Sequence, residues 1–208
     1  MTARFSPASL CSVALLGALA MAPGAATAAA PAPGAPAPAF TLNDTAGRAV
    51  NLADHRGKFV VLEWTNPECP FVQKHYVSKN MQTLQKEAGG KDVVWLAINS
   101  TNEDHGEYKT AEQMASWMRA QGAAPKATLL DGRSTTGKAY AAKTTPHMFV
   151  IDPSGKIVYN GAIDDKRSAN PADTRTANNY VRAALTEALA GKPVTVASTT
   201  PYGCSVKY

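Results

Sequence analysis

The stretch KFVVLEWTNPECPF, residues 58–71, joins an apolar run to a cysteine that is followed directly by a proline. Residues 58–64 are almost continuously apolar, which is typical of a central strand covered on both faces. A polar loop follows, and over residues 70–88 apolar side chains recur every three or four positions, as on one face of a helix. Proline is favoured in the first helical turn. The stretch therefore predicts a buried strand, a loop, and a helix with Cys69 at its N-terminus.

The flanking sequence continues this alternation of strands and helices. We expect a hairpin at residues 40–52, strands at 92–99 and 127–130, helices at 110–121, 134–142 and 173–190, and a second hairpin from residues 147–152 and 156–162. Right-handed crossovers place the two long strands side by side. The prediction is an α/β domain: a central mixed sheet flanked by helices, with an N-terminal hairpin extension and a C-terminal tail. Functional groups of such sheets gather at the carboxyl ends of strands, where Cys69 is expected.

The N-terminal region has the layout of an export signal. Arg4 precedes an apolar run over residues 10–21, and the sequence ATA at residues 26–28 matches the small-residue pattern at which signal peptides are cleaved. The apolar run is too short for a stable membrane anchor. We therefore predict a cleaved signal peptide at residues 1–28 and a periplasmic or secreted protein.

The remaining chain divides into three parts. Residues 29–38 are rich in alanine and proline and predict a semi-extended linker. A single domain is expected at residues 39–195, followed by a tail at residues 196–208 that carries Cys204. The formal net charge is +5, but lysine and arginine are scattered, so no nucleic-acid partner is predicted.

Three cysteines are encoded, and Cys11 would leave with the signal peptide. The mature chain then keeps Cys69 and Cys204, which can form only one intramolecular disulfide in an oxidising compartment. A thiol at a helix N-terminus meets unpaired N–H groups and the positive end of the helix dipole, which favour the thiolate. Cys69 is therefore the candidate attacking thiol.

Two motifs resemble a known fold family. The sequences EWTNPECPF at residues 63–71 and TTPHMFVID at residues 144–152 resemble the thioredoxin fold, and more closely its redoxin branch of peroxiredoxin-like and thioredoxin-like proteins related to AhpC/TSA. The segments CPFVQKHY at residues 69–76 and GCSVKY at residues 203–208 are similar to one subgroup of that branch. The resemblance covers roughly residues 40–192.

This resemblance carries expectations about the site. It implies that Pro146 is a cis-proline facing Cys69, and that Thr145 and Pro146 form the groove that receives the extended backbone of a partner. Trp64 is expected to border the same site. For a thiol-based redox protein we expect no organic cofactor and no metal, and protein or small-molecule thiols and disulfides as partners.

Two positions depart from the patterns of the better-known relatives. Val72 stands three residues after Cys69, where a thioredoxin has its second cysteine, so disulfide exchange within one motif is excluded. Asn66 stands three residues before Cys69, where a peroxiredoxin has threonine or serine. Both departures argue against peroxidase activity, and the remaining chemistry is one thiol with a possible partner elsewhere in the chain.

Cys204 is the candidate partner, and three roles stay open for it. It is a resolving thiol for a sulfenate or mixed disulfide on Cys69, or half of a static disulfide, or a separate thiol. A static disulfide would be worth about 4–5 kcal/mol for so long a loop in the chain-entropy model. Gly203 permits a close approach of the tail backbone.

Two functions follow from these alternatives. The first is an exported thiol-based redox protein that uses Cys69, with Cys204 as a candidate resolver: either a thiol–disulfide oxidoreductase or a protein with antioxidant-type activity on a peroxide. The second is a binding module without catalysis, which holds copper or a protein partner and has a structural Cys69–Cys204 disulfide. His75 and His147 are the candidate imidazole ligands in a copper site, since thiolate and imidazole both suit copper. Asp164 and Asp165 are candidate groups for proton transfer.

Overall fold

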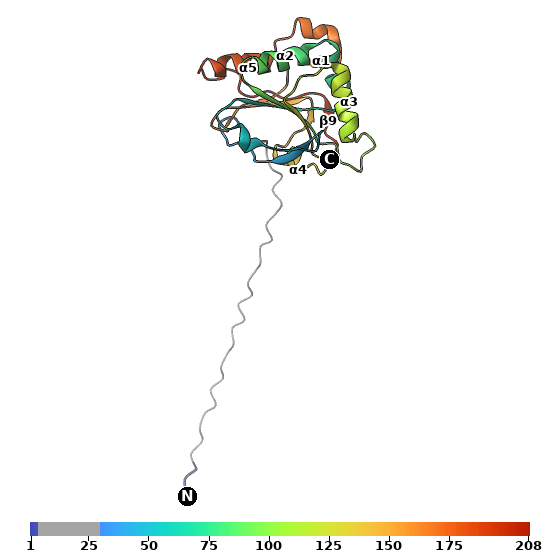
Figure 1. Ribbon diagram of the computed structural model, residues 1–208. Helices are drawn as coiled ribbons and strands as arrows, with labels where there is room; N and C mark the ends of the chain where they lie inside the picture. Colours follow the sequence, from blue (N-terminus) through green and yellow to red (C-terminus); the bar gives the residue numbers. More distant parts are fainter. Residues whose placement is uncertain (4–29) are drawn as a thin grey trace.

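A seven-stranded mixed sheet forms the centre of the protein in the computed structural model, which describes residues 1–3 and 30–208 (Figure 1). The predicted signal peptide falls almost wholly on residues 4–29, outside the described residues. The strand order is β2-β1-β5-β4-β3-β7-β8, in which β3–β4 and β4–β5 are parallel and the other pairs are antiparallel. The strands are β1 (Thr41–Asp44), β2 (Ala49–Asn51), β3 (Val60–Trp64), β4 (Val94–Asn99), β5 (Ala127–Leu130), β7 (His147–Ile151) and β8 (Ile157–Gly161).

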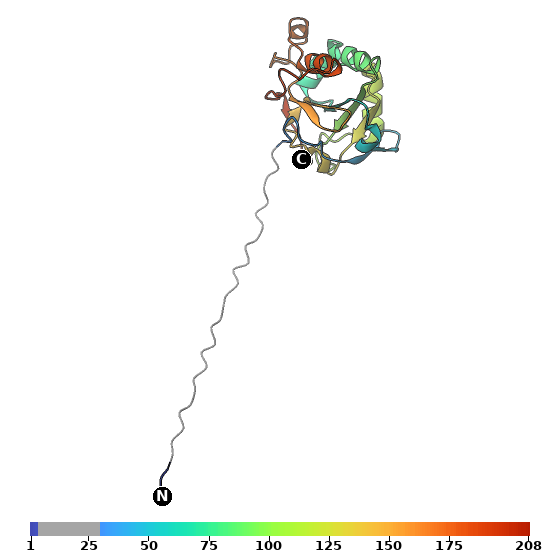
Figure 2. The same ribbon diagram turned by 90° about the vertical axis from the view of Figure 1, so that its left-hand side faces the viewer.

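The helices lie mainly on one face of this sheet. Figure 1 shows α1, α2 and α5 together on one side and α4 on the other, and Figure 2 shows the same layering from the side. The helices are α1 (Pro70–Val77), α2 (Asn80–Gly89), α3 (Ala111–Gln121), α4 (Thr135–Ala139) and α5 (Tyr180–Leu189), with 3₁₀ helices η1 (Leu52–His55) and η2 (Pro171–Arg175). The short strands β6 (Thr144–Thr145) and β9 (Cys204–Ser205) pair in a second, two-stranded sheet.

The predicted central strand is confirmed. All five residues of β3 are buried, and successive side chains enter two different hydrophobic clusters, one on each face of the sheet. Val61 belongs to the cluster under α1, α2, α3 and α5, whereas Leu62 and Trp64 belong to the cluster on the other face. The register Val61↔Trp95 shows that the two long strands are parallel neighbours, as the crossover rule predicts.

The predicted single helix over residues 70–88 is two helices. Lys79 has a φ of 62°, in the left-handed region, and it ends α1 one residue before α2 begins. The side chain of Gln82 donates to the carbonyl of Tyr76 at 2.9 Å and so satisfies a carbonyl freed by the break. Both helices bury side chains in one cluster, which is why the apolar spacing continues across the break.

The predicted last helix, residues 173–190, is also shorter. Residues 171–175 form the 3₁₀ helix η2, and α5 begins only at Tyr180. Asn179 fixes this start, because its side chain accepts a hydrogen bond from the backbone N–H of Arg182 at 2.9 Å.

Residues 30–38, which belong to the segment predicted as a linker (29–38), are joined to the domain. The N–H of Gly34 donates to the carbonyl of Ile157 at 2.7 Å, and the N–H of Ala37 donates to the carbonyl of Gly155 at 3.0 Å. These bonds cover polar backbone at the start of the edge strand β8, and residues 197–199 bond to Asn160 farther along the same strand. The folded domain therefore starts before residue 39. Among the helices of the described residues, none has the length and apolarity needed to cross a bilayer.

A buried carboxyl group lies at the centre of the sheet. Glu63 is fully shielded from solvent and accepts hydrogen bonds from Tyr76 Oη at 2.8 Å, Trp95 Nε1 at 2.8 Å and Gln85 Nε2 at 3.2 Å. Burial raises the pKa of Glu63, and the three donors offset part of that rise. The folded protein therefore holds a proton on Glu63 more tightly than the unfolded chain does.

Replacing Glu63 with glutamine is expected to change how stability depends on pH. Since the folded-state pKa is raised, the wild-type protein loses stability as the pH rises through that value. The Glu63→Gln variant has no such loss. As the pH rises, its free energy of unfolding should therefore increase relative to that of wild type, by about 1.4 kcal/mol in total for each unit by which folding raises the pKa of Glu63. Urea unfolding across a series of pH values measures this difference.

The matched control is Glu87→Gln, since Glu87 is exposed on α2 and pairs with Arg182 at the surface. Its difference from wild type should change little over the same pH series. A difference between Glu63→Gln and wild type that is independent of pH would show that Glu63 is not a destabilising buried charge.

Candidate functional site

Cys69 lies where the chain passes from the carboxyl end of β3 into α1. It is the N-cap residue of α1, with φ −81° and ψ 118°, and Pro70 follows at the start of the helix, which confirms the predicted arrangement. The Cys69 side chain makes no capping hydrogen bond. The first N–H groups of α1 therefore contribute the positive end of the helix dipole beside this thiol.

The Cys69 thiol faces the turn before β7. Its Sγ donates to the carbonyl oxygen of Thr145 at 3.0 Å, and the Thr145–Pro146 peptide bond is cis, as the resemblance implies. Only 1% of Cys69 is exposed, and its side chain belongs to the hydrophobic cluster under α1, α2 and α5. The thiol is therefore held between the helix N-terminus and the start of β7, out of contact with bulk solvent.

The C-terminal tail covers this thiol. Strand β9 runs antiparallel to β6, in a register that places Cys204 opposite Thr145. Gly203, with φ 141°, comes so close that a Cβ at this position would lie 2.0 Å from the Thr145 carbonyl oxygen. Only glycine allows this approach. The edge that the resemblance assigns to a partner's backbone is thus paired with the protein's own tail.

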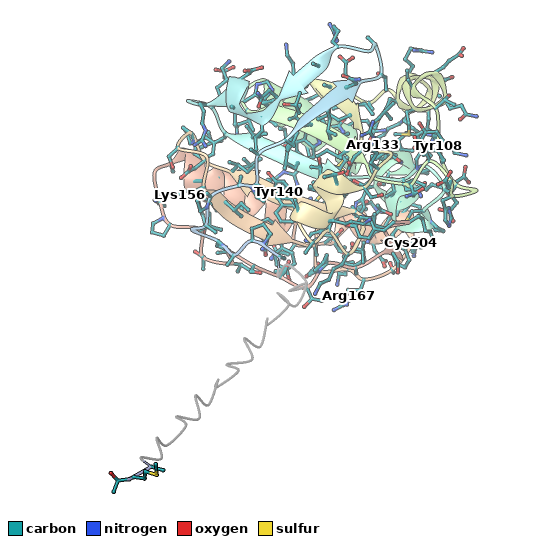
Figure 3. All side chains as sticks on the ribbon, turned by 90° about the horizontal axis from the view of Figure 1, so that it is seen from below. Tyr108, Arg133, Tyr140, Lys156, Arg167 and Cys204 are labelled. Carbon is teal, nitrogen blue, oxygen red and sulfur yellow. The ribbon has the colours of Figure 1, made fainter. Side chains whose placement is uncertain are left out.

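The pairing brings the two cysteines together. Both are free thiols: the register places Cys204 opposite Thr145, and the carbonyl of Thr145 accepts the hydrogen bond of the Cys69 thiol. Burial, and after it the neighbouring Cys69 thiol, raise the pKa of Cys204 to about 12. Cys204 is nevertheless partly exposed, unlike Cys69. In Figure 3 Cys204 is well separated from Lys156, which marks the far end of the β7–β8 hairpin.

Tyr202 fixes the tail to the domain through buried contacts. Its ring is 5% exposed and packs edge-on against Phe71 of α1, with ring centroids 5.9 Å apart. Its hydroxyl donates to Asp164 Oδ1 and accepts from Lys74 Nζ at 3.2 Å. Burial and the bond to Asp164 raise the pKa of Tyr202 far above its usual range, so the hydroxyl keeps its proton and remains a donor.

The partners of Tyr202 form a buried polar cluster. Lys74 and Asp164 are both about 1% exposed, and Lys74 Nζ lies 3.6 Å from Asp164 Oδ2. Lys74 also donates to the carbonyl of Lys166 at 2.6 Å. His75 lies beside them, but burial and the charge of Lys74 lower its pKa to about 3, so its ring is neutral at physiological pH. The charge partner of Asp164 is therefore Lys74.

Trp64 does not border the site, contrary to prediction. It is fully buried on the opposite face of the sheet, where Nε1 donates to Ser100 Oγ at 3.0 Å and the ring packs against Tyr140 and Phe149. The reason is the two-residue period of a strand: Glu63 points toward α1 and α2, so Trp64 points the other way.

The two candidate copper ligands also lie apart from Cys69. His147 points to the face occupied by Phe149, 4.6 Å away between ring centroids, and its Nδ1 accepts from the N–H of Lys143 at 3.2 Å. Burial lowers the pKa of His147 to about 3. Within residues 1–3 and 30–208, no three histidine, cysteine, aspartate or glutamate side chains gather closely enough to hold a metal ion. No ligand set supports the copper hypothesis there.

The remaining candidates have local roles. Asp165 accepts from the N–H of Asn178 at 2.9 Å, within a turn, whereas Asp164 belongs to the cluster under Tyr202. The Asn66 side chain accepts from the N–H of Glu68 at 2.8 Å and donates to Glu107 at 2.9 Å. Neither of these bonds of Asn66 goes to the Cys69 thiol.

Sequence reasoning missed Lys74 and Tyr202. Lys74 stands in a helix beside glutamine and histidine, a pattern that indicates an exposed face. The one available signal is Tyr202, an aromatic residue in a tail with few other apolar groups, placed two positions before Cys204. An aromatic residue so close to the candidate cysteine Cys204 indicates that its side chain packs against the domain and holds the tail in place.

Comparisons with known proteins identify the family and the fold of this chain. The model of the AhpC/TSA family matches residues 33–160. The thiol-disulfide oxidoreductase ResA of Bacillus subtilis (strain 168) is 30% identical over 121 residues, which make up 58% of this chain and 62% of ResA. The match therefore spans about three fifths of the length of that relative.

Solved structures share the fold over more of the chain. An uncharacterised conserved protein from Geobacillus kaustophilus superposes with a TM-score of 0.72 and 30% identity, covering 83% of this chain and 90% of that one. A hypothetical protein from Sinorhizobium meliloti 1021 superposes with a TM-score of 0.71 and 26% identity, covering 83% of this chain and 92% of that one. The fold is also shared with the thioredoxin domain of a thiol-disulfide oxidoreductase from Bacteroides vulgatus. That domain superposes with a TM-score of 0.51 and 21% identity, covering 70% of this chain and 96% of that one. By its fold and by the family match over more than half of its length, this chain is a thioredoxin-fold member of the AhpC/TSA family.

Proposed function

We propose that this protein is an exported thiol–disulfide oxidoreductase in which Cys69 and Cys204 form one intramolecular redox couple. The observation that carries the proposal is the pairing of β9 with β6, which holds Cys204 opposite Thr145, the residue whose carbonyl accepts a hydrogen bond from the Cys69 thiol at 3.0 Å. Two thiols held in this way close a disulfide without searching for each other, because their effective concentration is high.

The couple replaces the two-cysteine motif of a thioredoxin. Val72, at the position of the second cysteine, is fully buried in the core and has no redox chemistry. Cys204 supplies the missing thiol from the tail, at the edge where a redoxin binds its partner. Bond closure between the two sulfurs removes two protons and two electrons from the dithiol, and a disulfide of the partner accepts them and becomes two thiols.

Export and partner class complete the proposal. Export rests on the sequence of residues 1–28, and the compartments it leads to allow a disulfide to persist. The kinship to a thiol-disulfide oxidoreductase supports protein or small-molecule thiols and disulfides as partners. In the direction of thiol oxidation, the bridged protein takes two electrons and two protons from a dithiol, which becomes a disulfide.

Either cysteine variant is expected to abolish this reaction. When bridged protein is mixed with a reduced peptide that contains two cysteines, the peptide should lose two hydrogens, as measured by mass spectrometry over time. Cys69→Ser and Cys204→Ser have no bridge to give up, so the rate should fall by about 100-fold or more, to the uncatalysed level. The control Ser205→Ala, on the exposed side of β9, should react like wild type.

Full activity of Cys204→Ser would contradict the couple and would assign the chemistry to Cys69 alone. If the bridged wild-type protein oxidises the peptide no faster than the two cysteine variants do, the result would instead support a static disulfide.

Tyr202 is expected to act as a positioning residue for the couple. Tyr202→Phe keeps the ring on Phe71 but removes the bonds to Asp164 and Lys74. Because hydrogen bonds to charged groups contribute about 1.5–3 kcal/mol, bridge closure should slow roughly tenfold or more. Addition of diamide to the reduced protein, quenched with an alkylating reagent at intervals and followed by intact mass, gives the closure rate.

Tyr208→Phe is the matched control, since it removes a hydroxyl from the same tail that donates only to the neutral carbonyl of Ala142. Its closure rate should stay within about threefold of wild type. Equal rates for wild type and Tyr202→Phe would show that the buried cluster contributes to folding alone.

A further inference from the structure

We propose that an outside thiol attacks Cys204, and not Cys69, in the bridged protein, and that Cys69 leaves as the thiolate. The inference rests on the proposed function, because it requires the Cys69–Cys204 disulfide. It assigns the two sulfurs different tasks: Cys204 is the sulfur that exchanges with partners, and Cys69 is the internal sulfur that opens and closes the bridge.

The direction of attack on a disulfide is restricted. The incoming thiolate approaches one sulfur along the line of the S–S bond, on the side opposite to the sulfur that leaves. An attack on Cys69 would have to come from the side of Cys69 that faces away from Cys204. An attack on Cys204 would come from the side of Cys204 that faces away from Cys69.

The protein leaves only one of these two approaches open. Cys69 is 1% exposed and packs in the hydrophobic cluster with Val72 and Met148, so the side facing away from the tail is filled by the core. Cys204 is partly exposed on β9, one of the two strands of the small β6–β9 sheet. Access therefore favours an attack on Cys204.

The tail also blocks the usual path of a partner to Cys69. A partner backbone that paired with Thr145 would have to displace Cys204 from that edge. Displacement would break the contacts of Tyr202 with Asp164 and Lys74, all of which are buried. The contact between Gly203 and the Thr145 carbonyl would be lost as well. A partner thiol that reaches Cys204 from solvent needs none of these changes.

The chemistry of the two sulfurs points the same way. A disulfide breaks faster when the leaving thiolate is well stabilised. Cys69 leaves beside the N-terminus of α1, which stabilises negative charge. Cys204, on the short strand β9, has no helix N-terminus of its own to stabilise a leaving thiolate. Both access and leaving-group stability thus select the same sulfur.

The step balances as one thiolate displacing another. The S–S bond between Cys69 and Cys204 breaks, a new S–S bond forms between the partner sulfur and Cys204, and the electron pair stays on Cys69. The partner class is an accessible thiol, either a small molecule or a flexible cysteine on a protein surface. An extended strand that docks along β6 is not required.

Adduct mapping tests the assignment directly. Bridged wild-type protein is mixed briefly with glutathione, and released thiols are trapped at once with N-ethylmaleimide. Digestion separates the peptides that carry Cys69 and Cys204, and mass spectrometry shows which cysteine bears glutathione and which bears the maleimide. We expect at least about tenfold more glutathione on Cys204 than on Cys69, with the maleimide on Cys69.

The same bridged protein in guanidinium chloride is the control, since unfolding exposes both sulfurs and should bring the two adducts to near-equal amounts. Glutathione mainly on Cys69 in the folded protein would overturn the inference and leave the proposed redox couple intact. A wild-type protein that forms no bridge under oxidation would overturn the couple itself, and the inference with it.

Discussion

Gly203 passes so close to the carbonyl oxygen of Thr145 that a single added carbon would lie 2.0 Å from it. This backbone contact lets β9 pair with β6, and the pairing places Cys204 opposite Thr145, next to the Cys69 thiol. The geometry of the dithiol depends on it, because a side chain at residue 203 would push the tail away from the edge. The strand edge beside Cys69 is thereby occupied by the chain itself.

A buried ion pair supports this contact from within. Removing Lys74 and Asp164 from water is costly, and their 3.6 Å separation leaves Asp164 Oδ2 without a hydrogen bond of its own. The Tyr202 hydroxyl bonds to both groups, so the docked tail completes a cluster that would otherwise hold poorly satisfied charges. The arrangement ties the position of Cys204 to side chains that sequence order keeps far apart. Docking of the tail and satisfaction of the cluster are in this sense one event.

Much of this could be read from the sequence, but only where the signal is local. The continuous apolar run before Trp64 and the proline after Cys69 predicted the central strand and the helix start. The side of the sheet that Trp64 faces could not be predicted, because a strand buried on both faces shows no polar alternation. The break between α1 and α2 at Lys79 could not be predicted either, because no glycine stands at this left-handed position. The cluster of Lys74 with Tyr202 joins residues separated by 128 positions, and no periodicity carries such information.

Redox titration of the wild-type protein tests the central claim most directly. The protein is equilibrated with a series of ratios of reduced to oxidised glutathione, quenched with an alkylating reagent under denaturing conditions and weighed intact. The account predicts one reversible transition, at monomer mass, between a form with two labelled thiols and a bridged form with none. Two labelled thiols at every ratio, or a bridge found only between two chains, would contradict it.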